Sequence, residues 1–183
     1  MLKKDFKYKI VKGFLSPEIA KLAYLYLVFR HQNNRDPNNF DFNQIKNGDT
    51  SFYSDPLMES ILHWSLEKMQ KETGLQLWPT YSFTRMYTKF ADLKKHTDRP
   101  SCEVSVTVQL GSCGTTKWPI YIDNVPVVLE DGDAVIYLGM ELEHWREEFN
   151  GDHHAQVFLH YVDRNDKHAS EKFDRRRFLA TLK

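Results

Sequence analysis

Three residues in the second half of the chain have the types and spacing of a metal site. His96 and Asp98 are two positions apart, so on an extended segment both side chains project from the same face. His144 follows the segment 132–139, whose Gly-Asp start is typical of a tight turn leading into an apolar strand. Two imidazoles and one carboxylate bind non-haem Fe(II) and leave positions open for other ligands. The three residues therefore predict an iron site.

Each of these motifs also has an ordinary explanation. A His-x-Asp pair is common in proteins and usually has no function. His144 fits equally well as a surface histidine on a loop over residues 141–148. It is the combination of the motifs, in this order and beside these strands, that favours metal binding.

Two stretches in the first part of the chain have the pattern of helix starts. Ser16-Pro17 and Asp55-Pro56 each combine a capping side chain with a proline at the first helical position. Apolar residues at three- and four-residue spacing follow both starts, as on the buried face of a helix. We predict that the second helix runs from about residue 57 to residue 72.

Strand-forming sequence begins with residues 6–11, which alternate apolar and polar, and dominates the chain after Pro79. Gly-rich or Asp-Gly turns separate the later runs. Besides the strand after Pro79, we predict strands at residues 103–110, 118–123, 125–129, 134–138 and 156–162. Helices followed by many short strands indicate helices packed on one side of a largely antiparallel sheet or barrel.

Charge and composition argue against several classes of protein. The formal net charge is zero, with 25 basic and 25 acidic side chains, which gives no electrostatic reason for nucleic-acid or membrane binding. Two cysteines are too few for a disulfide framework or a cysteine zinc site. No apolar run has the length of a signal or membrane segment, so we expect a cytoplasmic protein. We interpret the cluster Arg175–Arg177 as a solvated helix face.

At these motifs the chain resembles the 2-oxoglutarate- and Fe(II)-dependent oxygenases, nearest their prolyl-4-hydroxylase-like branch. Residues 11–18 are similar to the strand-to-helix opening of that branch. Residues 87–98 are similar to its tyrosine followed by His-x-Asp. Residues 132–137 together with His144 are similar to its Gly-Asp strand and distal histidine.

The resemblance implies a mainly β, α+β fold: a double-stranded β-helix (jelly roll) core with N-terminal helices packed on one side. We expect one oxygenase domain over residues 1–183, divided into a helical part to about residue 78, the jelly-roll core at about 79–164, and a basic tail at 165–183. The resemblance also implies Fe(II) bound by His96, Asp98 and His144, with 2-oxoglutarate as co-substrate.

One departure from the branch concerns the far carboxylate of 2-oxoglutarate. The branch places an Arg or Lys about ten residues after the distal histidine, whereas residues 151–156 contain no permanent cation. A guanidinium is the natural bidentate partner of a carboxylate. Three replacements are open: His154 with Gln156, which share one strand face; Arg146; or an arginine from the other sheet, Arg85 or Arg99.

Among these replacements we predict Arg146, supported by His154 and Gln156, with Tyr87 donating its hydroxyl as the resemblance implies. The ordinary alternative for Arg146 and Arg99 is a salt bridge to Glu147 or Glu103. His160 shares the strand parity of His154, and we expect it to be a hydrogen-bonded core residue.

The implied activity is that of a dioxygenase that consumes O2, hydroxylates an amino-acid or protein side chain, and releases succinate and CO2. Loops 31–54 and 111–117 are candidate walls for this primary substrate, which the sequence does not identify. Two alternatives stay open. A cupin-like jelly-roll protein that binds metal without 2-oxoglutarate would explain the missing cation. A nucleic-acid demethylase on the same fold would use the Arg175–Arg177 cluster, against the balanced net charge.

Overall fold

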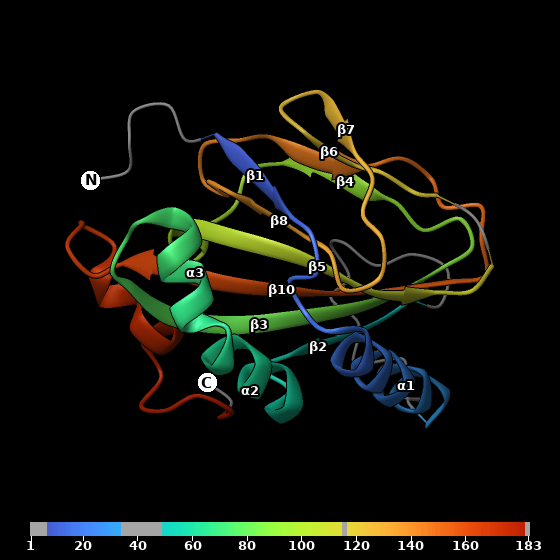
Figure 1. The fold of residues 1–183 in the computed structure, drawn as a ribbon, viewed down its shortest axis with the longest axis horizontal. Helices are drawn as coiled ribbons and strands as arrows, with labels where there is room; N and C mark the ends of the chain where they lie inside the picture. Colours follow the sequence, from blue (N-terminus) through green and yellow to red (C-terminus); the bar gives the residue numbers. More distant parts are fainter. Residues whose placement is uncertain (1–6, 34–48, 115–116, 182–183) are drawn as a thin grey trace.

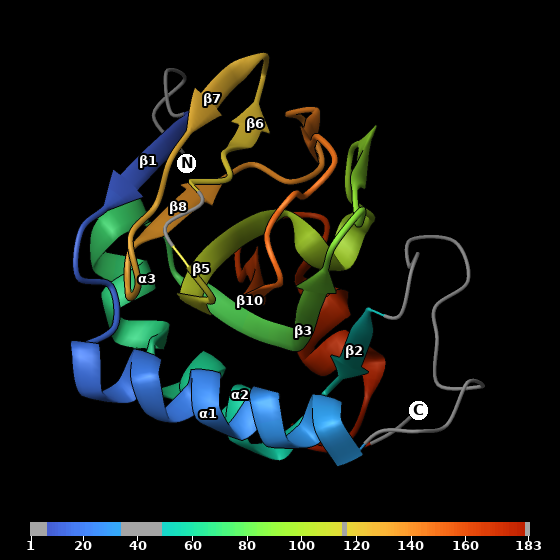
Figure 2. The same ribbon diagram turned by 90° about the vertical axis from the view of Figure 1, so that its right-hand side faces the viewer.

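Two antiparallel sheets face each other in the computed structural model, which describes residues 7–33, 49–114 and 117–181. The helices lie along the outer face of the larger sheet, and the smaller sheet covers part of its other face (Figure 1 and Figure 2). This arrangement confirms the predicted jelly-roll core with helices on one side.

Among the residues that the structure describes, the larger sheet has six strands, all paired antiparallel. Their spatial order is β1 (Tyr8–Val11), β8 (Ala134–Tyr137), β5 (Val104–Ser112), β10 (His153–Asp163), β3 (Leu77–Thr88) and β2 (Thr50–Tyr53). The smaller sheet has the order β4 (Leu93–His96), β9 (His144–Arg146), β6 (Ile120–Ile122) and β7 (Val125–Val127).

The predicted strands are all present, and their ends differ from the prediction by at most three residues. In the first part of the chain, β1 confirms the strand predicted at residues 6–11, whereas β2 was not predicted, and both strands join the larger sheet. The polar connection predicted at 31–54 is shorter than expected, since a helix extends to Asn33 and β2 begins at Thr50. Residues 34–48 of that loop, and residues 115 and 116 of the turn 111–117, lie outside the described residues.

In the described part of the chain, three helices cover the larger sheet: α1 (Pro17–Asn33), α2 (Pro56–Trp64) and α3 (Leu66–Thr73). The prediction of one helix over 57–72 is wrong, because the helix breaks at Ser65. Met58, Leu62 and Met69 nevertheless enter the same core, so the apolar spacing continues through the break and does not reveal it. Gly74 ends α3 in the left-handed conformation that favours glycine, with φ of 72°.

Asp55 connects two of these helices. Its Oδ1 accepts hydrogen bonds from the backbone N–H groups of Leu57 (3.0 Å) and Met58 (3.3 Å), and its Oδ2 accepts one from the Tyr26 hydroxyl of α1 (2.7 Å). Loss of an N-cap carboxylate typically costs about 1–2 kcal/mol.

We therefore expect Asp55→Ala to lower the free energy of unfolding by about 1–2 kcal/mol, measured by denaturant titration. Asp55→Asn keeps a capping oxygen, and we expect it to retain most of the stability. Equal losses in the two variants would contradict a capping role for Asp55.

The two faces of β5 differ in chemistry. Val104, Val106, Val108 and Leu110 belong to the apolar core shared with the helices. Ser105 and Thr107 lie on the opposite face, where their hydroxyls bond groups between the two sheets. The interior between the sheets is therefore polar along this strand, and it is here that the candidate site is built.

The interpretation of Arg175–Arg177 as a solvated helix face is wrong. The segment Ala169–Arg175 is a kinked 3-10 helix rather than an α-helix. Arg176 is buried, and its Nη2 lies 2.7 Å from Oε1 of Glu59, a buried carboxylate of α2. Burying an unpaired carboxylate at Glu59 would cost free energy, and the guanidinium of Arg176 in the C-terminal tail balances its charge. Within the described residues, no helix has the length and apolar character needed to cross a membrane.

Candidate metal centre

His96 and His144 are brought together by strand pairing in the smaller sheet. His96 is the last residue of β4 and His144 is the first of β9, and the antiparallel register places the two directly opposite each other. Their ring centroids are 4.3 Å apart. His144 therefore lies on a strand and is largely buried, which excludes the surface-loop interpretation.

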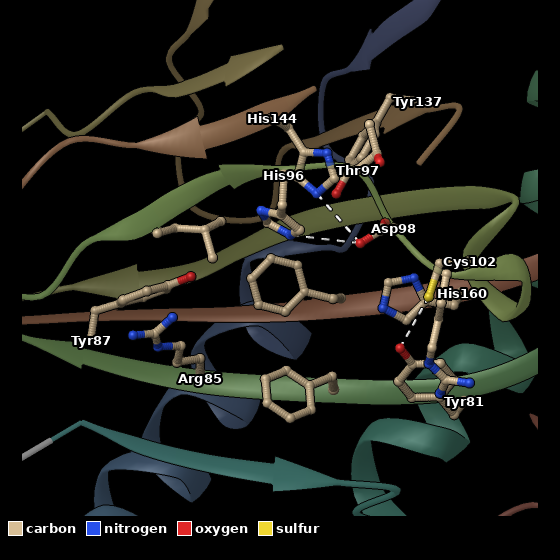
Figure 3. A pocket seen from close by; sticks show the side chains of 14 residues that line it. Tyr81, Arg85, Tyr87, His96, Thr97, Asp98, Cys102, Tyr137, His144 and His160 are labelled. Atoms are coloured by element: carbon tan, nitrogen blue, oxygen red, sulfur yellow. Dashed lines mark hydrogen bonds and ion pairs between the residues drawn. The ribbon is translucent and has the colours of Figure 1, made fainter. Parts of the chain in front are cut away.

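Asp98 completes the group, two residues after the end of β4. Its Oδ1 lies 3.7 Å from Nε2 of His96 and 3.6 Å from Nε2 of His144 (Figure 3). Ligand atoms of the three side chains all lie within 4.8 Å of one another, which leaves room for one ion between them. The donor set of two nitrogens and one carboxylate oxygen fits Fe(II).

Both imidazoles are oriented by backbone carbonyls. Nδ1 of His96 lies 2.6 Å from the Lys94 carbonyl, and Nδ1 of His144 lies 2.9 Å from the Leu142 carbonyl. Because a carbonyl only accepts, each Nδ1 carries the proton and each Nε2 is left with a lone pair directed at the ion's position.

The protonation states also suit a metal. Burial, followed by repulsion from His144, lowers the pKa of the His96 imidazole and favours its neutral, ligating form. Burial by itself would raise the pKa of the Asp98 carboxyl. Hydrogen bonding with His144 and electrostatic interaction with the imidazoles of His160, His144 and His96 outweigh that effect, so this pKa is lowered and the carboxylate is favoured.

The triad lies on the wall of a cavity of about 330 Å³. Figure 3 shows Tyr87 and Arg85 at one end of this cavity and Tyr81, Cys102 and His160 at the other. The side chains of β3 that line it are the alternate ones, as strand geometry requires.

A second cluster surrounds Trp118, a residue to which the sequence analysis gave no role. Arg146 is buried, its Nη1 donates to the Trp118 carbonyl (2.6 Å), and its guanidinium lies 4.5 Å from the Trp118 ring centre. The Trp118 ring also contacts Tyr87 (4.8 Å between centroids) and His154 (5.1 Å). Gln156 Nε2 donates to Nε2 of His154 (3.0 Å). The structure thus brings together the four residues predicted to contact the co-substrate.

The polar groups of this cluster are incompletely bonded within the described part of the chain. The Tyr87 hydroxyl, Arg146 Nε, His154 Nδ1 and Gln156 Oε1 are buried and have no hydrogen-bond partner there. Because His154 Nε2 accepts from Gln156, its Nδ1 carries the proton, so three of the four groups are donors. Buried polar groups are almost always paired, and such a set of donors suits an anionic ligand.

Arg146 supplies the positive charge of this cluster. Burial lowers its pKa to about 10, which leaves the guanidinium charged near neutral pH. Burial, reinforced by Arg146, holds the pKa of His154 well below its usual value, so that imidazole is neutral. Among the described residues, no carboxylate pairs with Arg146, and the alternative of an ion pair with Glu147 is not observed.

The two alternative arginines are engaged elsewhere. Arg85 lines the cavity, but its Nε and Nη2 bond Oδ2 of buried Asp49 at 3.0 and 2.8 Å. Arg99 donates to both carboxylate oxygens of Asp174, at 2.6 and 2.9 Å, and does not pair with Glu103. Both charges are therefore balanced by carboxylates.

His160 is buried and hydrogen-bonded, as the sequence analysis predicted, with its Nδ1 2.9 Å from Ser105 Oγ. Burial lowers its pKa to about 4, which leaves the imidazole neutral near pH 7. Ser105, Cys102 and Tyr81 were not predicted at this site, because single serine, cysteine and tyrosine residues in strands carry no specific sequence signal.

Comparison with known proteins gives structural matches only, since no family model and no curated protein sequence matches the chain. A prolyl-4-hydroxylase from Pseudomonas putida superimposes with a TM-score of 0.67 at 16% identity, covering 88% of this chain and 95% of that one. The viral collagen prolyl hydroxylase of Paramecium bursaria Chlorella virus-1, in complex with 2OG, superimposes with a TM-score of 0.63 at 10% identity, covering 86% of this chain and 96% of that one.

A third match is the non-heme alpha-ketoglutarate-dependent epimerase SnoN from nogalamycin biosynthesis, with a TM-score of 0.68 at 12% identity, covering 86% of this chain and 78% of that one. All three have low sequence identity and cover most of both chains. The chain therefore has the jelly-roll fold of the Fe(II)- and 2-oxoglutarate-dependent oxygenases, a fold it shares with prolyl-4-hydroxylases.

Proposed function

We propose that the protein is an Fe(II)- and 2-oxoglutarate-dependent oxygenase whose metal ligands are His96, Asp98 and His144. The observation that carries the proposal is that two candidate binding sites lie in the same interior, between the two sheets. A two-histidine, one-carboxylate group of suitable size lies on the cavity wall, and a cluster of buried donors with an unbalanced cation lies between the same sheets. The fold it shares with known oxygenases supports the same function.

Arg146, Tyr87, His154 and Gln156 are proposed to hold the far carboxylate of 2-oxoglutarate. Arg146 supplies the charge and its Nε–H, Tyr87 its hydroxyl, and His154 its Nδ1–H, the three donors that lack a partner in the described residues. Gln156 orients His154 through its amide. The positive charge that the oxygenases of the prolyl-4-hydroxylase-like branch place about ten residues after the distal histidine would then come from Arg146 on β9, two residues beyond His144.

Fe(II) with 2-oxoglutarate would supply oxidation of a substrate C–H bond by O2, with release of succinate and CO2. The chain's own residues bind and orient the reactants and limit access of water. Tyr81, Phe83 and Phe158 give the cavity an aromatic wall. With a volume of about 330 Å³, the cavity suits a single amino-acid side chain or a small metabolite as the hydroxylated group.

The alternative of a cupin-like protein that binds metal without 2-oxoglutarate has one observation in its favour: β10 carries no lysine or arginine. The demethylase alternative is weakened, because Arg176 is buried and Arg175 pairs with Glu171, which leaves no cluster of three exposed arginines.

Anaerobic titration with Fe(II) and then 2-oxoglutarate tests the proposal. We expect a weak visible absorption band that requires both components and is lost in His144→Ala. Iron binding without such a band would favour the cupin-like alternative. No iron binding in the intact protein would overturn the metal assignment itself.

Arg146→Met tests the co-substrate contact while keeping most of the side-chain volume. Loss of a charge-assisted hydrogen bond of roughly 1.5–3 kcal/mol should raise the 2-oxoglutarate concentration for half-saturation about ten-fold or more. Iron affinity measured on the same samples is the control, since Arg146 lies only two residues from His144 and a distorted strand would change both. Unchanged 2-oxoglutarate binding would mean that Arg85, or His154 with Gln156, holds the far carboxylate of 2-oxoglutarate instead of Arg146.

A further inference from the structure

The two oxygens of the Asp98 carboxylate have different partners. Oδ1 lies near both imidazole Nε2 atoms, at 3.7 and 3.6 Å. Oδ2 accepts a hydrogen bond of 3.0 Å from the hydroxyl of Ser105. Only one of the two oxygens is therefore directed at the position of the ion.

Ser105 lies on β5 directly opposite His160 on β10, and its side chain is fully buried. Its hydroxyl has one proton and three possible acceptors: Oδ2 of Asp98 at 3.0 Å, the carbonyl of Cys102 at 3.2 Å, and His160 Nδ1 at 2.9 Å if that nitrogen carries no proton. The carboxylate is the only charged acceptor of the three, so it receives the proton. The contact of 2.9 Å between Ser105 Oγ and His160 must then be donated by His160 Nδ1–H.

The His160 ring is itself held in place. The register between β10 and β3 shifts between Leu159 and Tyr161, so His160 occupies an irregular position of the kind that often re-aims a side chain near a site. Its ring packs against Tyr81, with centroids 4.6 Å apart. These contacts direct Nδ1 at Ser105.

Gly139 leaves room for this arrangement. Its carbonyl accepts from the Asp98 backbone N–H (2.8 Å). A side-chain Cβ at residue 139 would collide with Asp98 Oδ2 and would lie 2.7 Å from Ser105 Oγ. The absence of a side chain at Gly139 therefore allows the Asp98 carboxylate and the Ser105 hydroxyl to lie in contact.

Packing alone does not account for a serine and a histidine here. The opposite face of β5 is filled by valines, and a buried polar pair costs free energy unless each member is bonded. Both members are bonded, and the chain of bonds ends on the carboxylate that faces the two histidines.

We propose that Ser105 and His160 are positioning residues that act in series. His160 orients the Ser105 hydroxyl, and Ser105 occupies Oδ2 of Asp98, so that the carboxylate presents Oδ1 alone to the metal. The inference rests on the proposed metal centre and adds two residues that do not touch the metal.

Co2+ in place of Fe(II) gives a test that needs no turnover, because its visible spectrum reports both affinity and coordination geometry. Loss of a hydrogen-bond partner of a metal ligand typically weakens metal binding about 10–100-fold. We expect a loss of this size in Ser105→Ala, together with an altered spectrum as Oδ2 becomes free to bind the ion. His160→Leu, which removes the donor, should behave similarly, whereas His160→Asn keeps an N–H near the Nδ1 position and should bind almost normally.

The double variant Ser105→Ala with His160→Leu separates positioning from general damage to the core. If His160 acts through Ser105, the double variant should bind Co2+ no more weakly than Ser105→Ala alone. Thr107→Val is the matched control, since Thr107 lies on the same face of β5 and bonds Tyr137 rather than the triad. Its affinity and spectrum should not change.

Wild-type affinity and spectrum in Ser105→Ala, or additive losses in the double variant, would overturn the inference. If Ser105→Ala does not fold, equal affinities of His160→Asn and His160→Leu would overturn it by the same measurement. Failure of the unmodified protein to bind Co2+, or unchanged binding in His96→Ala, would instead reject the proposed metal centre.

Discussion

Replacing Asp98 with alanine is expected to weaken Fe(II) binding by more than about 100-fold, beyond the 10–100-fold typical of losing a ligand's hydrogen-bond partner. Asp98 is the only anion in the proposed triad, and the two histidines would bind as neutral imidazoles, since their Nδ1 atoms face backbone carbonyls. Alanine would remove both the oxygen ligand and the charge that balances the cation. Anaerobic equilibrium dialysis against Fe(II) measures the loss.

Glu143→Ala is the matched control for this experiment. It removes the same charge beside His144, but the Glu143 carboxylate is exposed on the outside of the sheet, where it lies 2.9 Å from Lys95. We expect its iron affinity to stay close to that of the unmodified protein. Similar losses in the two variants would mean that Asp98 acts through the general electrostatic field and is not a ligand.

The sequence predicts the parts of this fold and site that depend on local pattern. Alternating patterns and short apolar runs bounded by turn residues identify the strands of the larger sheet after Pro79, although most of their side chains are buried on both faces. The two-residue spacing of His96 and Asp98 indicates that the two side chains lie on one side of the chain, at the end of β4 and just beyond it. His144 is found as an isolated histidine after the Gly-Asp strand.

The remaining features depend on contacts between distant segments, which local pattern does not contain. Trp118, two residues before β6, becomes the centre of the Arg146 cluster because Arg146 on β9 and His154 on β10 both pack against its ring. Ser105 meets Asp98 through strand register and the space left by Gly139. The break at Ser65 is hidden because both helices use one apolar stripe to bury themselves in one core. In each case the residue type is ordinary, and the role comes from tertiary packing.

The three arginines at 175–177 are a further case in which local sequence does not predict the environment of a charged side chain. All three look alike in sequence, yet Arg175 is exposed beside Glu171, Arg176 is buried, and Arg177 is exposed. Arg176 Nη2 also donates to the Thr80 carbonyl (3.0 Å), and its Nε donates to that of Phe173 (2.8 Å). One arginine thus fixes the tail against α2 and β3.

Arg176→Leu is expected to lower the free energy of unfolding by about 3–5 kcal/mol, the usual cost of leaving one partner of a buried ion pair uncompensated. Arg177→Leu, one residue further, should change it by no more than about 0.5 kcal/mol, as surface substitutions usually do. Chemical denaturation of the two variants measures the difference. Equal stabilities would show that Arg176 and Glu59 do not depend on each other.

A compensating variant identifies the cause of the loss. If the destabilisation comes from the bare carboxylate of Glu59, then Glu59→Met combined with Arg176→Met should recover much of it, since an apolar pair of similar volume carries no desolvation cost. If it comes instead from detaching the tail, the double variant should be as unstable as the single one. Detachment should also loosen Asp174, which binds Arg99 next to Asp98. A loss of Co2+ affinity in the double variant would therefore link the docked tail to the metal centre, whereas full affinity with restored stability would limit Arg176 to a structural role.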